Sequence, residues 1–90
     1  MTIYSDLKEK FPSLKWKEIQ NGCIGTIDDL NIKIKDHIDV KGEHIISIDA
    51  STRRSGFSTK TDYEFGIQLI ESIIFYRADL TQVIVTNTTS

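Results

Sequence analysis

Three turn signals between residues 20 and 43 constrain this 90-residue chain more than any other feature. Asn21 and Gly22 are typical of a two-residue hairpin loop, because both tolerate positive φ. Asp28 and Asp29 form a second candidate loop, and Gly42 closes a third loop of three residues. Apolar and polar residues alternate between these turns, as expected for strands with one buried face. The pattern predicts four antiparallel strands joined in sequence order.

Each loop fixes a register, and all three registers place apolar residues on one common inner face. The predicted pairs are Glu18–Gly25 and Trp16–Ile27 in the first hairpin, Gly25–Ile32 and Cys23–Ile34 in the second, and Ile34–Ile48 and Lys33–Asp49 in the third. Gly25 leaves a gap on the inner face that a large neighbour such as Trp16 could cover.

Two helices are predicted to flank the strands. Residues 2–11 repeat Ile3, Leu7 and Phe11 on one helical face before a proline ends the helix. Residues 61–80 begin with a Thr-x-x-Glu capping box at Thr61 and carry a broad apolar arc. Phe75 lies outside that arc, in the middle of the polar side.

These elements predict an α+β fold. A four-stranded antiparallel meander carries the short N-terminal helix and the long C-terminal helix on one face (α-β-β-β-β-α), in a single domain over residues 1–90. Residues 81–86 either extend the last helix or return as a short strand, and an extended segment is favoured. Residues 86–90 are expected to fray.

Composition narrows the function classes. A hydrophobic content of 39% and a charged content of 27% are those of a globular chain, and a net charge of −2 argues against a dedicated nucleic-acid binder. Cys23 is the only cysteine, so an intrachain disulfide is impossible. No apolar run is long enough to span a membrane, and we expect a cytoplasmic protein.

No cofactor, metal or catalytic residue is predicted. His37 and His44 lie near one hairpin, but the predicted register points His37 outward and His44 inward, so they do not converge on a metal. Cys23 belongs to the inner face and is expected to be a buried structural thiol.

Residues 51–60 form the first candidate binding segment. Arg53 and Arg54, with hydroxyl residues around them, precede the predicted start of the long helix and could hold an anion there. The alternative is a solvated connector, and it is favoured because Asp62 and Glu64 would oppose an anion at that helix end.

The outer sheet face is the second candidate. Its predicted charged and apolar residues are Lys15, Lys17, Lys33, Lys35, His37, Ile19, Ile24 and Ile45, with Asp28 and Asp49 as acids. This face could meet an acidic protein surface or a phosphate backbone, or its lysines could simply keep the sheet from pairing with other chains.

Three functions remain as hypotheses. The leading one is a small non-enzymatic protein-interaction module (an adaptor, an inhibitor of the kind phages and mobile elements encode, or a homo-oligomer). It would bind through Phe75 on the long helix, through the outer face, or through both. The second is a weak nucleic-acid binder using the outer-face lysines with Arg53 and Arg54. The third is a small-molecule or enzymatic role in a pocket at the Gly25 gap.

Overall fold

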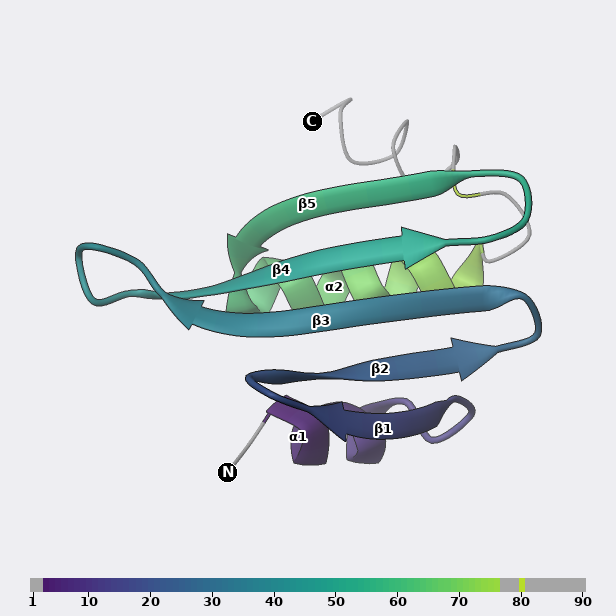
Figure 1. The fold of residues 1–90 in the computed structure, drawn as a ribbon, viewed down its shortest axis with the longest axis horizontal. Helices are drawn as coiled ribbons and strands as arrows, with labels where there is room; N and C mark the ends of the chain where they lie inside the picture. The colour runs from purple at the N-terminus through teal and green to yellow at the C-terminus, as the bar shows by residue number, and fades with distance from the viewer. Residues whose placement is uncertain (1–2, 77–79, 81–90) are drawn as a thin grey trace.

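The computed structural model describes residues 3–76 and Leu80, which form two helices and five strands. In chain order these are α1 (Ile3–Lys10), β1 (Lys15–Ile19), β2 (Gly22–Ile27), β3 (Leu30–Ile38), β4 (His44–Ser51), β5 (Gly56–Asp62) and α2 (Tyr63–Phe75). The strands form one antiparallel sheet in the order β1-β2-β3-β4-β5 (Figure 1). Each strand therefore pairs only with its neighbours in sequence.

Both helices lie on the same face of the sheet, behind the strands in Figure 1. Helix α1 packs against β1 and β2, and α2 packs against β4 and β5. The side chains buried between the two layers are almost all aliphatic: Ile3, Leu7, Leu14, Cys23, Leu30, Ile32, Ile34, Ile46, Ile48, Ala50, Leu69, Ile70, Ile73 and Leu80. The predicted α+β class, with both helices on one face, is confirmed.

Strand β5 is the main difference from the predicted fold, which had four strands and a connector over residues 51–60. Residues 52–55 are the turn of a fourth hairpin, and Gly56–Asp62 pairs with β4. Its inward positions are Phe57, Thr59 and Thr61, opposite Ala50, Ile48 and Ile46. Two of these three inward side chains are threonines, so the alternation of β5 lacked the apolar contrast that marks the other strands.

Helix α2 begins two residues later than predicted. Thr61 is part of β5, so the predicted capping box is wrong, and Asp62 is the N-cap residue. The Asp62 carboxylate accepts a 2.9 Å hydrogen bond from the Phe65 backbone N–H, which satisfies one of the free donors of the first turn. The helix ends at Phe75, before the predicted end at residue 80, and Tyr76 is its C-cap residue. The expectations for residues 81–86 and 86–90 lie outside the described residues.

Helix α1 covers Ile3–Lys10, within the predicted range of 2–11. It buries Ile3 and Leu7, the first two residues of the predicted apolar face. The chain then turns into β1, and the indole Nε1–H of Trp16 donates a 2.8 Å hydrogen bond across this turn to the carbonyl of Phe11. This bond satisfies the polar group of a half-buried tryptophan.

The predicted register of the first hairpin is wrong by two residues. Strand β1 pairs Ile19 with Gly22 and Trp16 with Gly25, so the loop is Gln20-Asn21. Asn21 has a φ of 61°, whereas Gly22 is a strand residue with negative φ. A Cβ on Gly22 would overlap the carbonyl oxygen of Ile34, so this glycine is required by close backbone packing rather than by a turn. A shift of two residues leaves the inner face unchanged.

The registers of the second and third hairpins are confirmed. Strand β2 pairs Gly25 with Ile32 and Cys23 with Ile34, across the Asp28-Asp29 loop. Strand β3 pairs Ile34 with Ile48 and Lys33 with Asp49. Gly42 is left-handed, with a φ of 81°, as the third loop requires.

Candidate functional site

The described helices lie on one side of the sheet and leave its outer face uncovered (Figure 1). The register places four rows of side chains across it: Lys15–Thr26–Asn31–Ser51–Gly56, Lys17–Ile24–Lys33–Asp49–Ser58, Ile19–Gly22–Lys35–Ser47–Lys60 and His37–Ile45–Asp62. The four predicted lysines, at 15, 17, 33 and 35, are all exposed on this face. Ile24, between Lys17 and Lys33, and Ile45, between His37 and Asp62, are half-buried. The structure therefore brings together every predicted outer-face residue except Asp28, which lies in the β2–β3 loop.

Two charged residues of this face were missed because β5 was missed. Lys60 and Asp62 are outward positions of β5. The described strand positions of the outer face then carry five lysines against Asp49 and Asp62. This face is locally positive on a chain whose net charge is −2. The alternation of residues 56–62 was the sequence signal that could have revealed the two additional residues.

Both outer-face aspartates already have partners. Asp49 lies opposite Lys33 and accepts a hydrogen bond from the Ser58 hydroxyl. Asp62 caps α2 through the Phe65 N–H. Each carboxylate is thus held by a hydrogen bond within the chain, and the five lysines outnumber the two aspartates on this face.

One end of the outer face is hollowed. A cavity of about 210 Å³ is lined by His37, Ile38, Asp39, Ile45 and Lys60. The imidazole Nε2 of His37 lies 2.6 Å from the hydroxyl of Ser47. The hollow thus combines an apolar floor with hydrogen-bonding groups, as small binding sites do.

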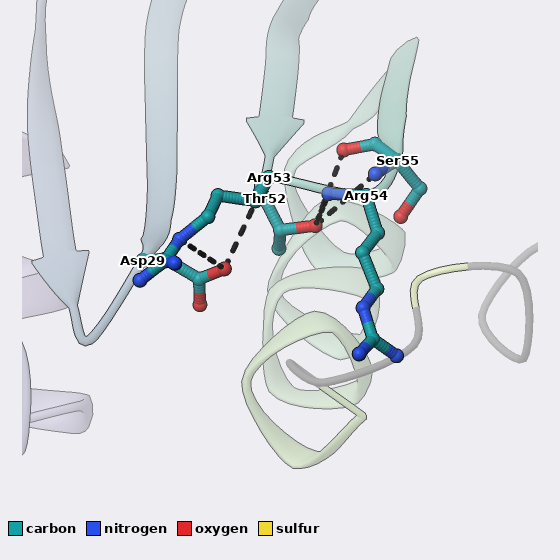
Figure 2. A network of polar contacts seen from close by, with 5 residues as sticks. All are labelled: Asp29, Thr52, Arg53, Arg54 and Ser55. Atoms are coloured by element: carbon teal, nitrogen blue, oxygen red, sulfur yellow. Dashed lines mark hydrogen bonds and ion pairs between the residues drawn. The ribbon is translucent and has the colours of Figure 1, made fainter.

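Arg53 and Arg54 lie in the turn between β4 and β5, at the opposite end of β5 from the first residue of α2. The prediction that they face a helix N-terminus is therefore wrong. Figure 2 shows the turn beside the β2–β3 loop, with the backbone N–H of Arg53 donating to Asp29 at 3.3 Å and its Nε 3.9 Å from the same carboxylate oxygen. The Arg53 side chain is 88% exposed, so this ion pair contributes little to stability.

The backbone donors of this turn are also occupied. Thr52 Oγ1 accepts 3.2 Å hydrogen bonds from the N–H groups of both Arg54 and Ser55 (Figure 2). Since a loop binds an anion mainly through free backbone N–H groups, the predicted anion-binding loop loses its main donors. A cavity of about 310 Å³ remains, lined by Asp29, Thr52, Arg53 and Arg54.

Phe75 is 76% exposed at the end of α2, and its ring meets the ring of Tyr76 edge to face, with centroids 4.8 Å apart. It belongs to the helical layer, so the structure does not join it to the outer-face lysines. The Gly25 gap, in contrast, is closed. A Cβ on Gly25 would lie 2.5 Å from Trp16 Cζ3, so the indole occupies the space of the hypothesised pocket.

The remaining reactive groups are dispersed. His44 pairs with Asp36 at 3.1 Å on the inner side, whereas His37 contacts Ser47 on the outer side. Within residues 3–76 and Leu80, no group of three His, Cys, Asp or Glu side chains is placed to hold a metal. Burial, and then the negative charge of Glu18, raises the pKa of Cys23 to about 11, so this thiol is a poor nucleophile at neutral pH.

A contact between the two helices was not predicted from the sequence. The Tyr63 hydroxyl donates a 2.7 Å hydrogen bond to Asp6. Burial, this hydrogen bond, and the charges of Asp6 and Asp36 raise the pKa of Tyr63 to about 12. Neither residue carries a local sequence signal for this pairing, because 57 positions separate them.

None of the helices in the described part of the chain is long and apolar enough to cross a membrane. Comparison of the chain with protein-family models, with curated proteins and with solved structures gives no match. Its function is therefore inferred from its own residues and surfaces.

Proposed function

We propose that the protein is a small non-enzymatic interaction module that binds an acidic protein surface through the outer face of its sheet. The observation that carries this proposal is the set of five outer-face lysines, set in rows around half-buried isoleucines and left uncovered by the described helices. Lysines across an interface steer an oppositely charged partner and fix its orientation. Apolar residues between them add buried area once water is excluded.

A protein partner fits this face better than a nucleic acid does. The described outer-face positions include no Phe, Tyr or Trp side chain, and His37 is the only ring there on which a base could stack. The chain as a whole is acidic, which disfavours the binding of a polyanion. The two arginines at 53 and 54, which the nucleic-acid alternative needs, lie beyond the outermost row in a separate turn.

The test is a charge reversal at the centre of the face. Lys17→Glu/Lys33→Glu changes two exposed lysines that flank Ile24. Lys10→Glu/Lys41→Glu makes the same change in charge at exposed positions off this face, on α1 and in the β3–β4 loop, and is the matched control. The two variants and the unmodified chain are immobilised and exposed to lysate of the source cell, with and without nuclease treatment.

If the proposal is correct, an acidic protein binds to the unmodified chain and to the control variant. The same protein does not bind to the outer-face variant. That protein is then purified and titrated against all three chains, and its affinity should fall at least about tenfold for the outer-face variant, as for the loss of two facing charge pairs. Equal affinity for all three chains, or binding abolished by nuclease, would contradict the proposal.

A further inference from the structure

Ser47 lies near the middle of the outer face, between two lysines. It pairs with Lys35 on β3 and with Lys60 on β5, and all three side chains point outward. Cβ atoms of directly opposite residues are about 4.5–5.5 Å apart, so two flexible lysine stems rise on either side of the Ser47 hydroxyl. Both ammonium groups can reach a ligand placed above it.

His37 determines whether the Ser47 hydroxyl can donate a hydrogen bond to a ligand. Its Nε2 lies 2.6 Å from Ser47 Oγ. When Nε2 carries hydrogen, it donates to Oγ, and the serine hydroxyl is then free to donate its own hydrogen away from the sheet. Three strands therefore supply two ammonium groups and one hydroxyl donor around one point.

The hollow described above adjoins this point and shares Lys60 and His37 with it. Its apolar lining comes from Ile45 and from Ile38, which is 64% exposed. The acid in its wall is Asp39, whose carboxylate already accepts hydrogen bonds from the backbone N–H groups of Lys41 and Glu43. A ligand with an anionic group beside an apolar group matches this arrangement.

We infer that Lys35, Ser47 and Lys60 form a subsite for a phosphate monoester on the acidic protein partner, with a neighbouring apolar side chain of that partner seated in the hollow. The inference rests on the proposed function and specifies its chemistry. A phosphoryl group presents three acceptor oxygens with up to two negative charges, which matches three separate donors better than the two coplanar oxygens of a carboxylate do.

The test uses a blocked Ala-Leu-phosphoserine-Leu-Ala peptide, the same peptide with serine or glutamate at the central position, and inorganic phosphate. Binding to the full chain is followed by amide ¹⁵N–¹H shifts. The phosphopeptide should bind at least about tenfold more tightly than the glutamate peptide or inorganic phosphate, and shifts should concentrate at Ser47, Lys60 and Ile45. Equal binding of the phosphoserine and glutamate peptides would overturn the subsite and leave the proposed function standing.

Variants separate a built subsite from general attraction to a positive face. Lys60→Gln and Ser47→Ala should each weaken phosphopeptide binding about five- to tenfold, as expected for one charge-assisted or neutral hydrogen bond. Lys10→Gln removes the same charge from α1, and Lys41→Gln removes it from the β3–β4 loop, both off this face. Neither should change the affinity. If Lys10→Gln weakens binding as much as Lys60→Gln does, the subsite is overturned, whatever the outcome of the partner experiment.

Discussion

The hydroxyl of Tyr63 donates a 2.7 Å hydrogen bond to the carboxylate of Asp6 and thereby joins the first turns of two helices from opposite ends of the described chain. Helix α1 packs on β1 and β2, whereas α2 packs on β4 and β5, so this bond ties together the two halves of the helical layer.

Removing this hydroxyl should weaken the fold moderately. Tyr63→Phe keeps the ring and deletes the hydrogen bond, and we expect the free energy of unfolding to fall by about 1 kcal/mol, the usual net value of one such bond. Urea denaturation followed by circular dichroism measures it. Tyr4→Phe is the matched control on α1. An unchanged denaturation midpoint for Tyr63→Phe would mean that the bond contributes nothing in solution.

The same hydroxyl predicts a loss of stability at high pH. The pKa of Tyr63 is raised from 10.0 to about 12 in the folded chain. Below pH 10 the hydroxyl is protonated in both states, and its stabilising effect is fully present. Between pH 10 and about 12 only the unfolded chain ionises at this position, so the free energy of unfolding falls with rising pH. Other groups titrate there too, so the difference between the unmodified chain and Tyr63→Phe is the informative quantity, and it should shrink across this interval.

Gly22 should tolerate no side chain. In Gly22→Ala the new Cβ would overlap the carbonyl oxygen of Ile34, and backbone atoms cannot rotate away as a side chain can. We expect a loss of at least about 2–3 kcal/mol, measured by chemical denaturation. Gly56→Ala is the matched control, because its Cβ would lie 3.8 Å from the nearest heavy atom, the carbonyl oxygen of Ala50. Equal effects of the two variants would refute the close approach.

Gly42 is constrained by conformation rather than by space. It has a φ of 81°, and a Cβ there would meet no atom within 4 Å. Gly42→Ala should therefore cost on the order of 1 kcal/mol through backbone strain alone. Gly42→Asn should recover part of this loss, since asparagine tolerates the left-handed region. If asparagine is as costly as alanine in thermal or urea unfolding, strain is not the cause.

Phe75 should matter little for folding. Because its side chain is 76% exposed, Phe75→Ser should change the free energy of unfolding by no more than about 0.5 kcal/mol. We also predict that Phe75→Ser disturbs association. The molecular mass in solution, measured by light scattering at several protein concentrations, would test this. Loss of the folded state in this variant would show that the exposed position of the ring is wrong.

The registers of β2–β3 and β3–β4 were predictable because loop length and apolar pattern agreed independently on the same pairs. The register of β1–β2 was not, since it depends on how closely the Gly22 backbone approaches Ile34 in another strand. An Asn-Gly pair predicts a turn, but it does not show whether the glycine belongs to the loop or to the following strand. Here Gly22 is a strand residue, because its backbone packs against the carbonyl of Ile34.

The site was predictable to the same extent as the strands. Alternation alone put Lys15, Lys17, Lys33 and Lys35 on one face. Lys60 was missed with β5, whose inward threonines resemble loop residues in the sequence. The position of Arg53 beside Asp29 could not be read from the sequence at all, because two turns separated by 24 positions meet only once the sheet has formed.

The meander order of the sheet also bears on how quickly the chain can fold. Every strand pairs with the strand that precedes or follows it, so each step of sheet formation closes only one short hairpin loop. Chains dominated by such local contacts cross a lower entropic barrier than β proteins whose distant strands must find each other. We therefore expect this sheet to form quickly for a β-rich domain, with the Tyr63–Asp6 bond among the last contacts made, since it joins residues 57 positions apart.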